Sequence, residues 1–278
     1  MDALRTRTLR LMELLGHDEE PYGVGYTDDR PEGFGPKPGI LLDRGKEERG
    51  ELDWHKVFST FSCLTGNIKR ARSRRVAAYI SHEECGCMGG GFYAGVYRPY
   101  LHMNVAYVST GVPGTHVEGE HYMPSLETMG AFMDEIDMPE HKGRYCVVKP
   151  LEDFAPEDPA LSVTFFARPE AMAGLHSLAG FATGDAHVVV APFGAACTCI
   201  VSWPQVFQSR GEEKAVIGGF DLSARKFLKP DELTFSVAMP LYVRMLDAME
   251  ESALTRENWK TVRKRVASSR RRWGGAKD

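Results

Sequence analysis

The chain has 278 residues, of which 43% are hydrophobic and 26% are charged. This composition is typical of a globular protein with a substantial core and excludes a disordered or fibrous chain. The formal net charge is −4, yet the residues before Arg256 carry 25 basic and 36 acidic side chains, a balance of −11. An acidic body repels phosphates, so we expect no nucleic-acid partner for it.

The chain starts with MDALRTRTLRLMELLG, which has the pattern of an amphipathic helix and not of a signal peptide. No apolar run reaches the roughly 18 residues that a membrane-spanning helix needs. Six cysteines in a chain without a secretion signal indicate a reducing, cytoplasmic location. In that setting clustered thiols favour metal or redox chemistry over a disulfide framework.

Helical and strand-like patterns follow one another without a simple alternation. Helices are expected over residues 1–16, 53–75, 169–182 and 240–254, and strands over 21–27, 75–81, 143–151, 161–167, 187–193 and 233–239. The run at 187–193, HVVVAPF, is the strongest strand pattern, whereas residues 28–50 are typical of a long surface loop. These patterns predict an α+β fold with mixed sheets and packed helices.

We expect one globular domain over residues 1–255 and a basic tail over 256–278. The tail carries nine basic residues against Glu257 and Asp278, so it is either a solvated helix end or a contact for RNA, an anionic membrane or an acidic partner.

Two stretches of the domain align without gaps, VAAYISHEECGC (76–87) and VVVAPFGAACTC (188–199). In both, nine positions separate the first valine from a Cys-x-Cys pair. The match is either a coincidence or the trace of an old duplication. A duplication predicts two pseudo-symmetric halves, 1–143 and 144–255, whose equivalent loops face each other.

The cysteine pairs are the clearest functional signal. Residues i and i+2 of an extended chain point to the same side, so two such pairs can supply four sulfurs to one centre. Soft thiolates favour zinc or an iron–sulfur cluster. We therefore predict a metal site formed by cysteines that lie in or near the two repeated stretches: Cys85, Cys87, Cys197, Cys199 and, as a substitute, Cys63. Cys146 lies between apolar neighbours and is expected in the core.

Two other interpretations of the cysteines stay open. They can be buried structural thiols, or they can form a metal-free redox or nucleophilic site with Cys85 as the reactive thiol. Glu83 and Glu84 precede Cys85 and disfavour a thiolate there. His82 could offset those charges or act as a metal ligand.

The glycine run that follows the first cysteine pair suggests an anion-binding loop. Gly89, Gly90 and Gly91 could turn their N–H groups toward sulfur or a bound anion, or they could simply form a tight turn. Arg225 could likewise face an anion, or it could pair with Asp221 four residues earlier. The run fits neither a P-loop nor a dinucleotide fingerprint.

A short acidic and histidine-rich patch offers a weaker signal. It consists of His116, Glu118, Glu120 and His121, in the sequence THVEGEHY. The patch could hold a divalent cation, or it could be an exposed loop, and the His-Glu-x-x-His metal motif is absent.

Several ordered motifs together resemble one known family. They are PYGVGY, FSCLTGNIKRAR, ECGCMGGGFYAG and the stretch from 218 to 259 that begins GGFDLSARKFLKPDE. They resemble the uncharacterised family called domain of unknown function 169, over roughly residues 8–259. The resemblance implies a compact α+β protein of archaea and anaerobic bacteria, with recurrent cysteines matching Cys63, Cys85 and Cys197. Cys87 and Cys199 are less general in it, which puts a four-thiol ligand set for the whole family in doubt.

The sequence thus supports two functions. The first is a metal or iron–sulfur protein with an electron-transfer or sensing role and a redox partner. The second is a small-molecule-binding protein or enzyme that uses a reactive cysteine and the glycine-rich loop. The oligomeric state is not encoded in these patterns.

Overall fold

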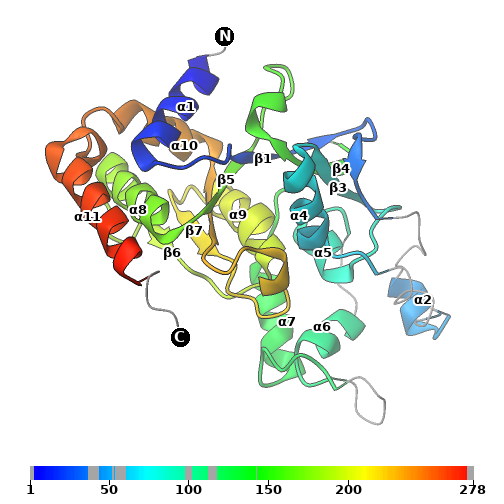
Figure 1. Ribbon diagram of the computed structural model, residues 1–278. Coiled ribbons are helices and arrows are strands. Elements are labelled where there is room, and N and C mark those ends of the chain that lie inside the picture. Colours follow the sequence, from blue (N-terminus) through cyan, green and yellow to red (C-terminus); the bar gives the residue numbers. More distant parts are fainter. Residues whose placement is uncertain are drawn as a thin grey trace.

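The computed structural model describes residues 3–36, 44–51, 53, 61–97, 102–111, 118–141 and 143–273. In this part of the chain helices pack on both faces of one mixed, eight-stranded sheet (Figure 1), which confirms the α+β prediction. The strands are β1 (Tyr22–Thr27), β2 (Gly33–Phe34), β3 (Ala77–Ser81), β4 (Tyr145–Pro150), β5 (Ser162–Ala167), β6 (Val189–Val190), β7 (Ala215–Gly218) and β8 (Leu233–Ala238).

The helices differ widely in length. They are α1 (Ala3–Leu15), α2 (Arg44–Glu48), α4 (Leu64–Arg74), α5 (Met88–Tyr93), α6 (His102–Val108), α7 (Leu126–Glu135), α8 (Pro169–Thr183), α9 (Trp203–Ser209), α10 (Met239–Ala248) and α11 (Glu257–Trp273). A π-helical turn, Thr198–Ser202, leads into α9. Proline stands in the first turn of α8 and α10, where its fixed φ suits a helix start and its missing N–H costs nothing.

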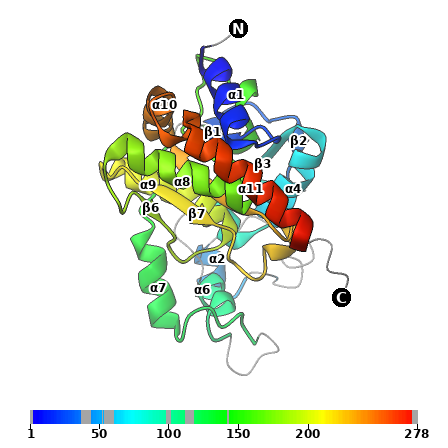
Figure 2. The same ribbon diagram turned by 60° about the vertical axis from the view of Figure 1, so that its left-hand side comes forward.

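The sheet has two apolar faces, and each is covered by its own helices (Figures 1 and 2). One core forms between the sheet and α4, α5 and α9, and it includes the buried side chains of Val24, Ile80 and Val148. The other forms against α1, α8 and α10 and includes Phe165 and Phe235. Alternate residues of β5 enter opposite cores, as the two-residue period of a strand requires.

The strand order is β2-β3-β4-β1-β5-β8-β7-β6. The same pattern of pairings runs outward from the centre on both sides. β1 and β5 pair antiparallel in the middle. From β1 outward come β4, β3 and β2, and from β5 outward come β8, β7 and β6. On both sides the first two pairings are antiparallel and the outermost one is parallel. Because parallel neighbours need a crossover, α4 joins β2 to β3 and α9 joins β6 to β7.

This repeat differs from the one expected from the sequence. The gapless match aligned the cysteine pair after β3 with the pair after β6, whereas the strand order makes β3 the counterpart of β7. The pairing pattern also groups β4 with β1, β2 and β3, although the expected boundary at 143/144 precedes β4. The division into halves stays a prediction, and the symmetric strand order is the observation that bears on it.

Other expected elements hold in part. The strand expected at 187–193 is only Val189–Val190, because Pro192 has no N–H for a ladder and Gly194 bends the chain at φ 156°. The loop expected at 28–50 contains β2 and α2. Of the helix expected from Asp53 to Arg75, α4 is confirmed, residues 61–63 are not helical, and residues 54–60 lie outside the described residues. The C-terminal basic segment is helical as α11 up to Trp273.

Candidate functional site

Three cysteines from distant parts of the chain meet beside the first core. Cys63 precedes α4, Cys87 precedes α5, and Cys197 precedes the π-helical turn that leads into α9. Cys63 and Cys87 are half-buried, whereas Cys197 is buried. The helices α5 and α9 lie on the same face of the sheet as α4, which explains why the three segments converge.

Electrostatics show that these thiols interact. Burial raises the pKa of Cys87 well above its ordinary value, and the charges of Cys63 and Cys85 raise it further. Burial also raises the pKa of Cys197, and the charges of Cys87 and Cys63 add to that effect. Cys87 and Cys197 are therefore protonated at neutral pH, and ionising one of them disfavours ionising the other.

The other three cysteines have their own surroundings. The Cys85 thiol donates a hydrogen bond of 3.0 Å to the Cys87 carbonyl oxygen, and its burial raises its pKa to about 11. Cys199 is buried next to β7, where burial raises its pKa to about 12 and the charge of Asp221 adds to the shift. Cys146 is fully buried in β4, as its apolar neighbours predicted.

Neither Cys-x-Cys pair is an extended chelating pair. Gly86 has φ 60° and folds the first pair into a turn. In the second pair Cys197 has helical dihedrals and Cys199 lies within the π-helical turn. The extended backbone on which the same-side expectation depends is therefore absent from both pairs.

No preformed metal site accompanies the thiols. In the part of the chain that the structure describes, three or more Cys, His, Asp or Glu side chains nowhere come together in a metal-binding arrangement. The ligand set of Cys85, Cys87, Cys197 and Cys199, with Cys63 as substitute, thus stays a prediction. His82 is exposed, and its ring stacks on Tyr97 at a centroid distance of 5.6 Å.

The glutamates next to Cys85 do not control its protonation. Glu84 is buried and accepts hydrogen bonds of 2.8 and 3.0 Å from Arg30, while Glu83 pairs with Arg144 at 3.3 Å. Burial is the main cause of the raised pKa of Cys85. The sequence argument assigned that effect to the carboxylates, and their arginine partners explain why it does not hold.

The glycine run is helical, which corrects the expected loop. Gly89, Gly90 and Gly91 all belong to α5. A Cβ on Gly91 would lie 2.4 Å from the Cys85 sulfur, and one on Gly90 would lie 3.3 Å from the Cys87 sulfur. The N–H of Gly90 donates to that sulfur at 3.2 Å. Glycine at positions 90 and 91 therefore makes room for the thiols.

The Arg225 side chain is hydrogen-bonded to the backbone of its own loop. Its guanidinium donates four hydrogen bonds of 2.7–3.1 Å to backbone carbonyl oxygens, those of Gly219, Lys229, Pro230 and Glu232. Binding an anion would require some of these bonds to break, so the anion-binding role of Arg225 stays a prediction. Asp221 instead accepts from Tyr122 and Ser223.

Carboxylates and phenols lie near the thiols, and the sequence did not single out the phenols. Asp221 adds to the raised pKa of Cys197 and lies 3.4 Å from the Ala196 N–H, which donates to it. Burial raises the pKa of Glu120, and the charge of Asp221 adds to the shift. Burial raises the pKa of Tyr107, and the charges of Glu120 and Cys87 add to the shift. The phenols carried no sequence signal, because single tyrosines far apart in the chain form no motif.

The acidic and histidine-rich patch is only partly described. His116 lies outside the described residues, whereas Glu118, Glu120 and His121 lie between α6 and α7. His121 has φ 54°, and its N–H donates to the carbonyl oxygen of Ser109. Glu120 is linked to the thiol region through Asp221, whose charge raises the pKa values of both Glu120 and Cys197.

Large exposed apolar side chains lie on the same segments as the thiols and Asp221. They are Phe61, Phe193, Phe220 and Leu222, and Tyr107 on α6 is exposed as well.

None of the helices that the structure describes combines the length and the apolarity needed to cross a membrane. Comparison with curated proteins and with solved structures found no match for the chain. A family model matches residues 10–248, which is most of the sequence and includes all six cysteines. The chain therefore belongs to the family described as uncharacterised ArCR, domain of unknown function 169, as the resemblance of its motifs implied.

Proposed function

We propose that this protein binds a soft metal ion or an iron–sulfur cluster through Cys63, Cys87 and Cys197, in a reducing, cytoplasmic compartment. The observation that carries the proposal is the mutual influence of these three thiols, which come from three separate helix starts. Electron transfer or sensing is the role that such a centre supports. Cys85 and Cys199 are the remaining candidates for further ligands.

The protonation state of the thiols favours a metal over a free nucleophile. A thiol whose pKa is raised by burial and by neighbouring thiols is a poor nucleophile at neutral pH. A bound cation removes this penalty, because it replaces the protons and neutralises the thiolates. Binding should therefore release protons and become tighter as the pH rises. The sulfurs would have to draw closer than in the metal-free arrangement, since no metal-binding group is preformed among the described residues.

The test is metal analysis of protein purified without oxygen, with its visible spectrum. We expect stoichiometric iron with broad absorbance near 400 nm, a region typical of thiolate–iron charge transfer, or stoichiometric zinc without it. Cys63→Ser, Cys87→Ser and Cys197→Ser should each lose at least about half of the metal. Cys146→Ala, which removes a core thiol, is the matched control and should keep it. Full loading of all three serine variants would rule out this ligand set.

A second function is favoured by the carboxylates beside the thiols. The pKa of Glu120 lies above that of an ordinary glutamate. The charges of Glu120 and Cys87 both add to the raised pKa of Tyr107. This arrangement suits a small-molecule site, or an enzyme in which the Cys87 thiol acts together with the carboxyl group of Glu120. It predicts that Glu120→Gln changes the pH profile of iodoacetamide labelling of Cys87 in metal-free, folded protein. An unchanged profile would contradict it.

A further inference from the structure

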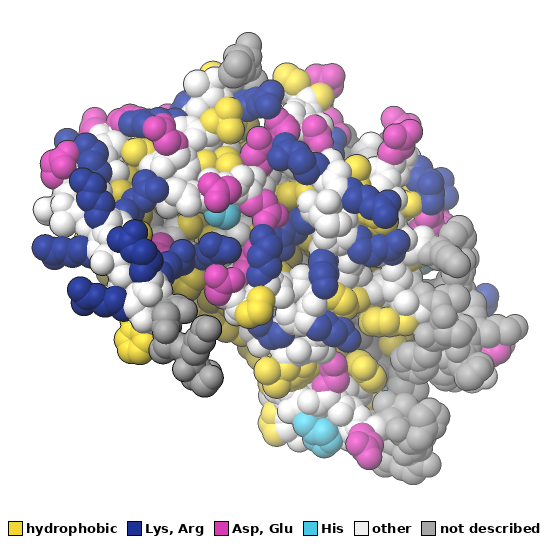
Figure 3. All heavy atoms as spheres, in the orientation of Figure 1, with side chains coloured by type: hydrophobic (Ala, Val, Ile, Leu, Met, Phe, Trp, Pro, Cys, Tyr) yellow, Lys and Arg dark blue, Asp and Glu magenta, His cyan; other side chains and the backbone are white. Residues whose placement is uncertain are grey.

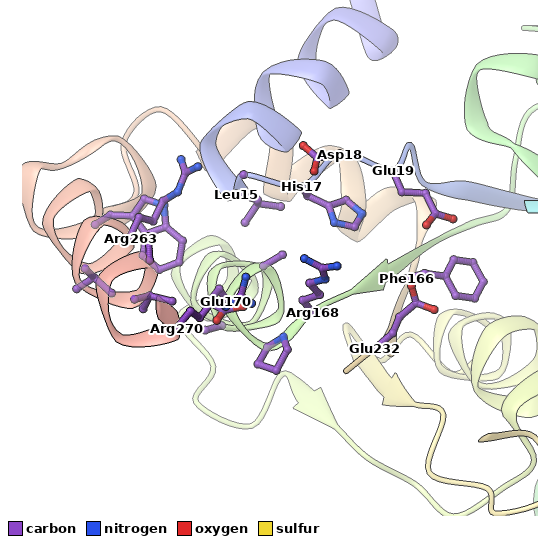
Figure 4. Close-up of a pocket in the computed structure, with 18 of the residues that line it drawn as sticks. Leu15, His17, Asp18, Glu19, Phe166, Arg168, Glu170, Glu232, Arg263 and Arg270 are labelled. Atoms are coloured by element: carbon purple, nitrogen blue, oxygen red, sulfur yellow. Dashed lines mark hydrogen bonds and ion pairs between the residues drawn. The ribbon is translucent and has the colours of Figure 1, made fainter. Parts of the chain in front are cut away.

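A second site, separate from the thiols, lies on the other side of the sheet. It is a cavity of about 590 Å³ between the loop Gly16–Glu19, the start of α8 and the helix α11 (Figure 4). This volume lies in the range of pockets that hold small organic ligands, about 300–1,000 Å³. In Figure 3 Lys and Arg side chains gather over α11 and border a hollow on that face.

The cavity combines an apolar wall with a charged one. The apolar wall includes Leu15, Ala171, Trp259, Val262 and Val266. Leu15 comes from α1, Ala171 from α8, and the other three from α11, so three helices enclose an apolar space. Because residues 249–273 lie beyond the family match, α11 adds a wall that the matched region does not supply. The indole N–H of Trp259 donates to the Leu14 carbonyl oxygen at 2.9 Å and holds α11 in place.

Most of the carboxylates that line the cavity already have cationic partners. Glu19 and Glu232 pair with Arg72 and Lys229, and Glu170 pairs with Arg270. Their negative charge is therefore compensated before any ligand enters.

Two nitrogen-bearing side chains remain for a ligand. Arg168, at the residue before α8, pairs with Asp231, which is not part of the cavity wall, and both side chains are more than half exposed. An exposed pair of this kind contributes little and opens easily. In Figure 4 the Arg168 guanidinium points toward His17. The Nε2 atom of His17 is buried and has no hydrogen-bond partner among the described residues.

We infer that this cavity binds a small amphipathic anion, a carboxylate or phosphate joined to an apolar body. Arg168 would hold the anionic group, and a ligand oxygen would give His17 Nε2 the partner that it lacks. The apolar body would lie against Leu15 and Trp259. The start of α8 adds a favourable dipole for negative charge. Such a ligand would stabilise the packing of α11 on the domain, since α11 forms one wall.

Calorimetric titration of the full chain tests this inference with four eight-carbon probes: sodium octanoate, octyl phosphate, octan-1-ol and octylammonium chloride. We expect saturable one-site binding of at least one anion, at least about 10-fold tighter than that of the alcohol, because a charged hydrogen-bonded group adds roughly this much. Octanoate and octyl phosphate distinguish the two anion chemistries. The inference would be overturned if neither anion bound saturably, or if octylammonium bound as tightly as the anions.

Substitutions locate the site. Arg168→Gln should weaken anion binding about 10-fold, and His17→Phe, which keeps a ring but removes the nitrogen, about 3-fold or more. Arg144→Gln is the matched control, because Arg144 forms an ion pair of similar length and exposure with Glu83 outside the cavity. Thermal unfolding confirms that each variant is folded. Equal affinities of the Arg168→Gln and Arg144→Gln variants would refute the site.

Discussion

Replacing Arg72 with alanine is expected to lower the free energy of unfolding by about 3–5 kcal/mol, the range for breaking a buried ion pair. Arg72 on α4 bonds Glu232 before β8 at 2.7 Å and Glu19 before β1, and its guanidinium lies 3.7 Å from the Phe166 ring centroid. The side chains of Arg72 and Glu232 are 8% and 2% exposed. The variant leaves Glu232 buried, with an ion pair to Lys229 at 3.6 Å.

Arg75→Ala is the matched control. Arg75 lies one turn further along, pairs with Glu20 and Glu152, and has a side chain that is 59% exposed. Solvent screens such pairs, so we expect a loss of less than about 1 kcal/mol. Urea unfolding of both variants measures the difference. If the two losses were equal, the buried network would not be what joins α4 to the β7–β8 side of the sheet.

The same network predicts an acid dependence of stability. Burial opposes ionisation of Glu19, but hydrogen bonds and charge from Arg72 and Lys229 outweigh it and hold the pKa of Glu19 below its ordinary value of 4.5. A lowered folded-state pKa contributes stability above the ordinary value, and this contribution is lost as the pH falls through the folded value. The stability difference between the wild type and Arg72→Ala should therefore narrow from about pH 6 to about pH 3.

Gly91→Ala is expected to cost about 1–3 kcal/mol, the range for overpacking a core. The new methyl group would lie 2.4 Å from the Cys85 sulfur and 3.2 Å from the Tyr97 Cβ, so a buried thiol would have to move. Because Cys85 neighbours the three-thiol cluster, the variant should also lower metal loading if the proposed centre forms. Thermal unfolding and metal analysis of one preparation measure both effects.

Gly180→Ala provides the control. Gly180 lies in α8, and a Cβ there would lie 4.0 Å from the Asp185 carbonyl oxygen, at ordinary van der Waals distance. Alanine should therefore stabilise the helix by about 0.5–1 kcal/mol. Adding Cys85→Ala to Gly91→Ala should recover at least about 1 kcal/mol relative to the sum of the single changes. Strict additivity would show that the sulfur is not the obstacle.

The strand order suggests how the thiol site arose from the fold. α4 and α9 are the crossover helices of the two outer parallel strand pairs, and Cys63 and Cys197 stand before these helical segments. Cys87, in contrast, follows β3, and the counterpart of that position follows β7, where Gly219 and Asp221 lie. The strand order thus places Cys63 and Cys197 before equivalent crossover helices, and Asp221 lies in the region that corresponds to Cys87.

The sequence by itself determined the elements whose signals are local. β1, β4, β5 and β8 follow from their β-branched and aromatic residues, and α8 and α10 from apolar periodicity with proline in the first turn. The core position of Cys146 followed from its neighbours in the same strand. Each of these structural features depends on residues within one turn or one strand. The order of the sequence motifs was enough to indicate the family.

Only the tertiary structure decided the features that depend on distant partners. Glycine is required at positions 90 and 91 because the Cys85 and Cys87 sulfurs occupy the space where side chains would lie. Cys63, Cys87 and Cys197 meet because α4, α5 and α9 share one face of the sheet. Arg72 pairs with Glu232, which lies 160 residues later in the sequence. Spacing along the chain carries no information about such contacts, since strand order and helix packing fix them.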